Sequence, residues 1–188
     1  MDIKNVLSVI SGILFAAAYI PYIRTILNGK TKPAKASWII WASLDAIIIA
    51  GMMAENSVNY QIICAFLGSS AVATLSLKYG IPGWSVLDKA CFIGAILGII
   101  LWGTFNNPLF GIIISLGVMF VGSVPTFVSV WKDPSHEDRF AWTLFWLSCV
   151  VAIPAIPHWT VANAAQPLTF FAIETVMMYI LFIKSPVR

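Results

Sequence analysis

Long apolar runs separated by short polar clusters extend along the whole chain. Each run is about as long as the ~20 residues that an α-helix needs to cross the hydrocarbon core of a bilayer. The separators are rich in Gly, Pro, Asn and Asp, residues that favour turns. The pattern therefore predicts seven membrane-spanning helices, over residues 5–27, 36–54, 58–79, 86–104, 108–131, 139–157 and 161–184.

The composition restricts the chain to the same class. Of its 188 residues, 60% are hydrophobic and only 10% are charged, whereas soluble domains carry about 45–50% apolar and about 25% charged residues. These values exclude a water-soluble globular domain, a disordered chain, a coiled coil and a disulfide scaffold. The three cysteines, Cys64, Cys91 and Cys149, lie inside apolar runs and form no CxxC pair, so they are expected to be small core residues.

The basic residues are distributed unequally between the two sides of the expected bundle. Seven spans place the termini on opposite sides, and only Lys4 then falls on the N-terminal side. The other ten are Arg24, Lys30, Lys32, Lys35, Lys78, Lys89, Lys132, Arg139, Lys184 and Arg188. Lys and Arg accumulate in cytoplasmic loops, so we expect a multi-pass protein of the cell (inner) membrane with its N-terminus outside and its C-terminus in the cytoplasm. A net charge of +3 without a long basic tract argues against nucleic acid as a partner.

The chain also aligns with itself. A shift of 104 residues, without a gap, superposes the first three expected spans on the last three and leaves the fourth as a linker. The rare residues that coincide are Ser11 with Ser115, Pro21 with Pro125, Trp38 with Trp142 and Asn59 with Asn163. The shift covers an even number of spans, so both copies have the same orientation in the membrane. We therefore expect a first three-helix repeat (1–81), a linker helix (82–106) and a second three-helix repeat (107–188).

Two parallel three-helix repeats joined by a linker helix are a known transporter architecture, and at this point the chain resembles the PQ-loop and SWEET superfamily. Each repeat of that superfamily has a proline near the inner end of its first helix, then a polar loop and an aromatic-rich second helix. The matching stretches here are residues 19–24 (YIPYIR) and 123–127 (SVPTF), with Tyr22 and Thr126 where the PQ pair has glutamine. Residues 21–41 also look like a widespread set of small uncharacterised bacterial membrane proteins. The resemblance implies a SWEET-like fold of seven transmembrane helices.

Two carboxylates stand deep inside expected spans. At 1.5 Å per residue, Asp45 lies ~13 Å into the second span and Glu174 lies ~15 Å from the inner end of the seventh, both close to the middle of a ~30 Å hydrocarbon core. An acid at this depth costs roughly 3 kcal/mol on insertion scales, so it must face the protein interior or a water-filled cavity. Either each acid is protonated and hydrogen-bonded to a neighbouring helix, or it binds a coupled proton or a cationic solute. The repeat aligns Glu174 with Ser70, a candidate hydrogen-bond partner.

Aromatic side chains share helical faces with these acids. Trp38 and Trp41 fall on the same face of the second span as Asp45, and the sixth and seventh spans have comparable faces. Aromatic rings bind cations through their faces or stack on planar heterocycles, although Trp near a span end also forms interfacial belts. The expected binding and coupling residues are Asp45, Glu174, Trp41, Phe145, Trp38, Trp142, Ser70 and Phe170.

Two prolines occupy equivalent positions in the repeats. Pro21 and Pro125 each leave a carbonyl without an amide donor in the preceding turn, which produces a kink or a hinge. A static kink that assists packing and a pair of hinges for gating at the inner side are both open. We treat the two residues as candidate hinges.

No enzyme motif occurs in the sequence. A nucleophile elbow, a P-loop, an HExxH motif and a Rossmann glycine pattern are all absent, and His136 and His158 lack metal-ligand spacing. We therefore expect no enzyme, no cofactor and no metal site. The expected function is transport of a small polar solute by alternating access, facilitative or proton-coupled, with sugars, vitamins, other metabolites and cations as candidate solutes. The alternatives are a ligand-binding membrane receptor and a substrate-binding subunit of a larger transport complex; the oligomeric state, including a homo-oligomer, stays open.

Overall fold

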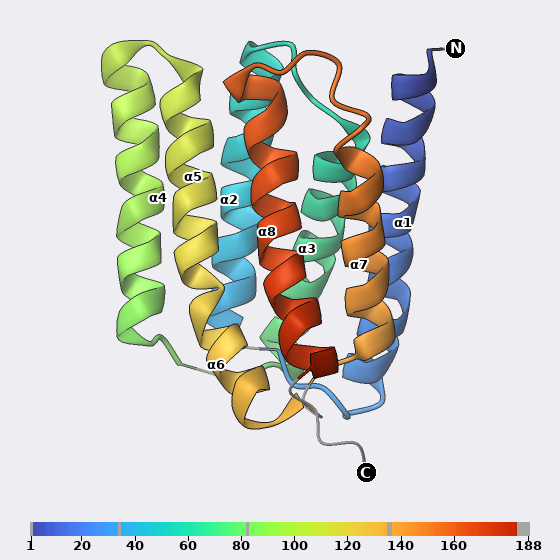
Figure 1. The fold of residues 1–188 in the computed structure, drawn as a ribbon. Coiled ribbons are helices and arrows are strands. Elements are labelled where there is room, and N and C mark those ends of the chain that lie inside the picture. The colour runs from blue at the N-terminus through green and yellow to red at the C-terminus, as the bar shows by residue number, and fades with distance from the viewer. Residues whose placement is uncertain (1, 34, 82, 135–136, 184–188) are drawn as a thin grey trace.

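A computed structural model of the chain describes residues 2–33, 35–81, 83–134 and 137–183, without the side chains of Pro125 and Ser129. The regular secondary structure in these ranges is entirely helical, which confirms the expected all-helical class. The helices lie side by side in a bundle (Figure 1). They are α1 (Ile3–Leu27), α2 (Lys35–Ala54), α3 (Tyr60–Tyr79), α4 (Val86–Phe105), α5 (Pro108–Gly122), α6 (Val124–Lys132), α7 (Arg139–Ala152) and α8 (Val161–Ile183).

Six helical segments of the described chain are long and apolar enough to cross a membrane, with α5 and α6 counted together as one of them. Helix α7 is apolar but has only 14 residues. The predicted sixth span, 139–157, was therefore too long: the helix ends at Ala152. Pro154 has no amide hydrogen to continue the helical ladder, and the chain continues in turns in which the Ala155 amide donates to the Ala152 carbonyl at 3.1 Å.

The predicted fifth span, 108–131, is interrupted at Ser123, between α5 and α6. Pro125 follows two residues later, and its missing amide hydrogen removes one bond from the ladder near this point. The Ser123 hydroxyl donates to the Met119 carbonyl at 2.9 Å and stabilises the interruption. Helix α1, by contrast, continues through Pro21 to Leu27. The two aligned prolines thus lie in different local structures.

The helices pack in two groups with one helix at the margin. Helix α3 packs against both α1 and α2, and α8 packs against α5, α6 and α7. The groups meet where α1 packs on α7 and where α2 packs on α5, while α4 lies at the edge of the bundle on α5 (Figure 1). Gly12 lets α1 approach α3 closely, because a Cβ atom there would lie 2.9 Å from the carbonyl oxygen of Tyr60.

The two ends of the bundle differ in charge. Helix α1 begins at one end, which we call the N-terminal end, and α8 finishes at the other (Figure 1). In the described ranges, Lys4 is the one Lys or Arg at the N-terminal end. The opposite end, which we call the basic end, carries Arg24, Lys30, Lys32, Lys35, Lys78, Lys89, Lys132 and Arg139. Lys184, Arg188 and His136 lie outside the described residues.

Candidate functional site

A cavity extends from the middle of the bundle toward the basic end. It comprises about 690 Å³ of space between protein atoms, part of it continuous with solvent. Nine of its seventeen lining residues are aromatic. The lining consists of Phe15, Tyr19, Tyr22, Trp38, Trp41, Asp45, Ala65, Ser69, Met119, Ser123, Thr126, Phe127, Trp142, Phe145, Phe170, Ile173 and Glu174. Each described helix except α4 contributes at least one residue to this lining.

Asp45 reaches the cavity from the middle of α2. Its side chain is only 3% exposed. Carboxylate Oδ2 accepts a hydrogen bond from the Ser69 hydroxyl of α3 at 2.7 Å, while Oδ1 is buried and has no hydrogen-bond partner among the described residues. One half of this carboxylate is therefore held in place and the other half is free to bind.

Glu174 enters the same cavity from α8, in the other helix group. It is 7% exposed, and its Oε2 atom is buried without a hydrogen-bond partner in the described part of the chain. Among the described residues, the cavity lining contains no Lys, Arg or His. The two acids thus share a low-dielectric space with no basic side chain in its lining, an arrangement that is costly when the acids are ionised and the space is empty.

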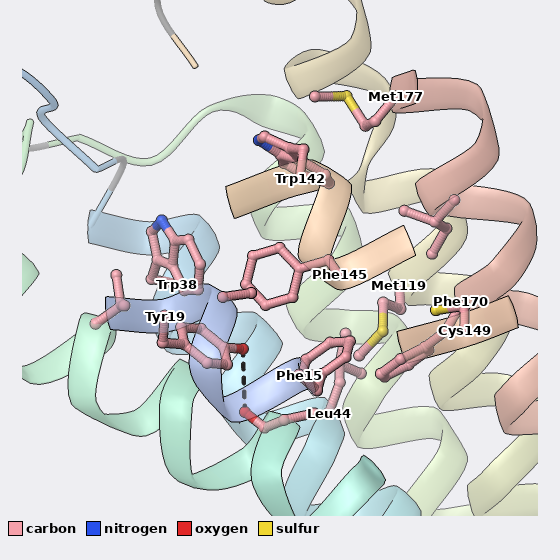
Figure 2. Close-up of a cluster of buried hydrophobic side chains, with 14 of the residues drawn as sticks. Phe15, Tyr19, Trp38, Leu44, Met119, Trp142, Phe145, Cys149, Phe170 and Met177 are labelled. Carbon is pink, nitrogen blue, oxygen red and sulfur yellow. Dashed lines mark hydrogen bonds between the residues drawn. The ribbon is translucent and has the colours of Figure 1, made fainter. Parts of the chain in front are cut away.

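Aromatic rings of the cavity lining pack against one another, and Figure 2 shows Phe15, Tyr19, Phe145 and Phe170 in this cluster. The ring of Phe15 lies 4.7 Å from that of Phe145 and 5.7 Å from that of Phe170, between centroids. Tyr19 contacts Phe145 at 5.0 Å, and its hydroxyl donates to the Ala65 carbonyl at 3.2 Å. These rings come from α1, α7 and α8, so the cluster joins both helix groups.

Tryptophans line the cavity toward the basic end. Trp38 lies 5.4 Å from Tyr22 and 5.1 Å from Trp41, between ring centroids. Trp142 packs against Phe145 at 5.9 Å. Trp38 and Trp142 are each 9% exposed, so both face the bundle interior, whereas a residue of an interfacial belt faces lipid headgroups.

Seven of the eight expected site residues line this one cavity. The eighth, Ser70, is half-buried and lies outside the lining, and the neighbouring Ser69 takes the hydrogen-bonding position beside an acid. Sequence reasoning missed Phe15, Tyr19 and Ser69. Adjacent helix positions differ by 100°, so only the rotation of α3, which its packing decides, could distinguish Ser69 from Ser70.

A set of uncharged polar side chains, all buried except the half-buried Asn59, lies on the N-terminal side of the ring cluster. We call it the polar layer: Ser11, Asn59, Gln61, Ser148 and Gln166, from α1, α7, α8 and the start of α3. The Ser11 hydroxyl donates to the Ser148 carbonyl at 3.0 Å, and the Ser148 hydroxyl donates to the Ser11 carbonyl at 2.8 Å. Gln61 Nε2 donates to Ser148 Oγ at 3.0 Å, Gln166 Nε2 to Gln61 Oε1 at 3.1 Å, and Asn59 Nδ2 to Gln166 Oε1 at 2.8 Å. The layer forms one continuous hydrogen-bonded chain across both helix groups.

A second cavity lies beyond the polar layer, at the N-terminal end. More than half of its lining residues are polar, among them Lys4, Asn56 and Asn163, together with Ser11 and Gln61 of the polar layer. Lys4 Nζ donates to the Pro157 carbonyl at 2.9 Å across its rim. These two cavities therefore lie toward opposite ends of the described bundle, separated by the polar layer and the ring cluster of Phe15, Phe145 and Phe170.

A third acid, Glu137, stands at the basic end just before α7. Its Oε2 atom accepts a hydrogen bond from Trp142 Nε1 at 2.9 Å, which connects it to the cavity wall. Burial of the carboxyl group raises the pKa of Glu137 from 4.5 to about 7; the Trp142 hydrogen bond lowers this pKa, and the charge of Asp138 raises it. Sequence reasoning missed this residue because a loop acid is normally solvated.

Comparison of the chain with protein-family models, with curated proteins and with solved structures gives no match.

Proposed function

We propose that the chain is a seven-helix transporter of the cell membrane that moves a small polar solute by alternating access. The observation that carries this proposal is the pair of cavities at opposite ends of the bundle, separated by a thin layer of side chains. Substrate sites of repeat transporters lie near the midplane between their repeats, and access alternates by movement of one unit against the other. The structure then corresponds to the state in which the solute site is approached from the basic end.

The packing of the helices supports two parallel repeats of three helices and a linker. In the first group α3 lies between α1 and α2, and in the second α8 has the same relation to α5 and α7. The shift of 104 residues aligns α1 with α5 and α2 with α7. The contact of α1 with α7 and the contact of α5 with α2 are therefore equivalent, and both occur. Helix α4 stands outside both groups, as a linker does. This arrangement is the one that the resemblance to the PQ-loop and SWEET superfamily implies.

In this proposal the basic end is cytoplasmic, following the charge asymmetry, and the N-terminus is outside. Asp45 and Glu174 contact the solute or a coupled proton, since they enter the cavity from different helix groups. Opening the N-terminal side requires the polar layer to separate, because it joins α1 and α3 to α7 and α8. Pro21 and the Ser123–Pro125 interruption are the points where α1 and the α5–α6 segment bend during this exchange.

Solute uptake into proteoliposomes tests the proposal. Liposomes with the purified protein are incubated in a mixture of metabolites, and their contents are identified by mass spectrometry against protein-free liposomes. We expect at least one solute to enter, and we expect Asp45→Asn with Glu174→Gln to reduce its entry while Glu55→Gln, an exposed acid at the N-terminal end, does not. A solute that binds the protein and never enters would instead support a receptor, and co-purification with an ATPase would support a subunit of a larger complex.

A further inference from the structure

We propose that the cavity is a binding site for an organic ammonium ion, a positively charged group with N–H donors on an apolar or aromatic body. The inference depends on the proposed function only for passage of this ion across the membrane. Binding itself depends on the cavity alone. Charge, hydrogen bonding and the aromatic lining each select for this class of ligand.

The charge of the two buried acids favours a cationic ligand. Asp45 and Glu174 are both more than nine-tenths buried, in a lining with no Lys, Arg or His among its described residues. A buried carboxylate needs an opposite charge or a set of hydrogen-bond donors. The described lining offers Asp45 one hydroxyl donor, from Ser69, and it offers the buried oxygen of Glu174 none. A bound cation supplies the charge that the lining lacks.

The unsatisfied carboxylate oxygens favour a cation that carries N–H donors. Asp45 Oδ1 and Glu174 Oε2 are acceptors that are buried and have no donor in the described structure. An ammonium group with N–H bonds donates to such oxygens, and hydrogen bonds to charged groups are stronger than neutral ones. A quaternary ammonium ion has the same charge but no N–H bond, so it leaves both oxygens unsatisfied.

The aromatic lining favours an organic cation over an inorganic one. Nine aromatic residues line the cavity together with the two acids, and the face of an aromatic ring attracts a cation, more strongly when the cation is desolvated. Ca²⁺ requires about six to eight oxygen ligands, and Mg²⁺ keeps most of its water. Apart from the two acids, the lining provides side-chain oxygens only from Tyr19, Tyr22, Ser69, Ser123 and Thr126. An organic cation needs fewer oxygens and uses the rings.

Matched ligand pairs separate charge from shape. Isothermal titration of the purified full-length protein in nanodiscs compares benzylammonium with benzyl alcohol, and butylammonium with butan-1-ol; empty nanodiscs correct for partition into lipid. In each pair both ligands donate a hydrogen bond and only the ammonium is charged. We expect the ammonium ion to bind at least about tenfold more tightly than the alcohol, and we expect benzyltrimethylammonium to bind more weakly than benzylammonium.

Variants then assign the preference to the two acids. Asp45→Asn and Glu174→Gln should each reduce the ratio of ammonium to alcohol affinity, whereas Glu55→Gln should retain it. Thermal unfolding of each variant shows whether it is folded. Equal affinity of ammonium and alcohol in both pairs for the wild-type protein would overturn the proposal, whatever the variants do, and so would an unchanged ratio in folded Asp45→Asn and Glu174→Gln.

The outcome separates this inference from the transport proposal. Ammonium binding that requires both acids, without uptake into proteoliposomes, would contradict transport and leave the cation site standing. Uptake of a neutral solute by a protein with no ammonium preference would support transport and contradict the cation site.

Discussion

The polar layer and the acid-containing cavity are neighbouring regions that differ in how well their buried polar side chains are hydrogen-bonded. In the polar layer, Gln61 and Gln166 are almost completely buried, and each makes side-chain bonds to other members of the layer. In the cavity, Asp45 and Glu174 are nearly as buried, and each has an oxygen without a partner in the described structure.

This difference distinguishes a closed surface from a binding surface. A buried polar network with its partners in place is stable as it stands, so in the proposed transporter the polar layer is the closed side. Buried acceptors without donors raise the free energy of the empty protein and lower it when a suitable ligand enters. The same two helix groups thus meet through satisfied hydrogen bonds in one region and around unsatisfied carboxylate oxygens in the other.

The largest expected effect comes from removing the centre of the polar layer. Gln61→Leu loses three side-chain hydrogen bonds, to Ser148, Cys149 and Gln166. At about 1 kcal/mol for each bond, the free energy of unfolding should fall by about 3 kcal/mol. SDS titration of the protein in mixed micelles measures it.

A double-mutant cycle controls this prediction. Gln166→Leu removes bonds to Gln61 and Asn59, so Gln61→Leu with Gln166→Leu should cost less than the sum of the two single changes. Strictly additive losses would contradict a single connected layer.

A smaller effect is expected where α3 supports the cavity wall. A Cβ atom at Gly68 would lie 2.0 Å from Cε2 of the Tyr19 ring, so Gly68→Ala forces this ring to move and disturbs its bond to Ala65. Overpacking of this kind costs about 2 kcal/mol, and benzylammonium affinity should fall with it. Gly117→Ala is the control, because no atom lies within 4 Å of a Cβ there. Equal unfolding free energies of the two variants would show that the Tyr19 ring is not fixed by α3.

The aligned serines of the two repeats allow a third comparison. Ser11 makes two hydrogen bonds with Ser148, whereas the Ser115 hydroxyl is buried without a partner in the described chain. Ser11→Ala should reduce the free energy of unfolding by about 1 kcal/mol. Ser115→Ala should leave it unchanged or raise it slightly, because it removes an unsatisfied hydroxyl. Equal losses in the two variants, measured by the same SDS titration, would contradict the difference between the repeats.

Much of the helix pattern could be predicted from sequence, because long apolar runs and turn residues are local signals. The errors occurred at prolines: Pro154 shortened α7, and the Ser123–Pro125 segment divided the fifth predicted span. A proline inside an apolar run is compatible with a continuous helix, as Pro21 shows, and with an end or an interruption. Packing against neighbours decides between these outcomes.

The candidate site could be predicted in part for a related reason. A charge inside a span is rare, so Asp45 and Glu174 stood out, and the aromatics on their faces followed from helical periodicity. Gln61 and Gln166 lie in equally apolar surroundings, and a search for uncharged polar residues within spans would have found them. Their assembly into one layer depends on contacts between residues 105 positions apart, which no local pattern records.

The smallest expected effect is a pH dependence at the mouth of the cavity. Because the pKa of Glu137 is raised from 4.5 to about 7, mainly by burial, the folded protein binds this proton more tightly than the unfolded chain does. The stabilisation is complete below about pH 4.5 and is lost as the pH rises to about 7. Glu137→Gln keeps an acceptor for Trp142 and has no proton to lose, so its stability should fall less than that of the wild type between about pH 5 and about pH 8.

The difference between the two stability curves isolates Glu137, because the other acids are present in both proteins. Glu137 is only half-buried as a residue, so solvent screens part of its charge, and we expect the curves to diverge by less than about 1 kcal/mol. Glu55→Gln, at the exposed N-terminal end, should give a curve parallel to the wild type. Divergence in the opposite direction, with Glu137→Gln losing more stability at high pH, would mean that the ionised Glu137 is stabilised at the cavity mouth by the basic side chains of that end.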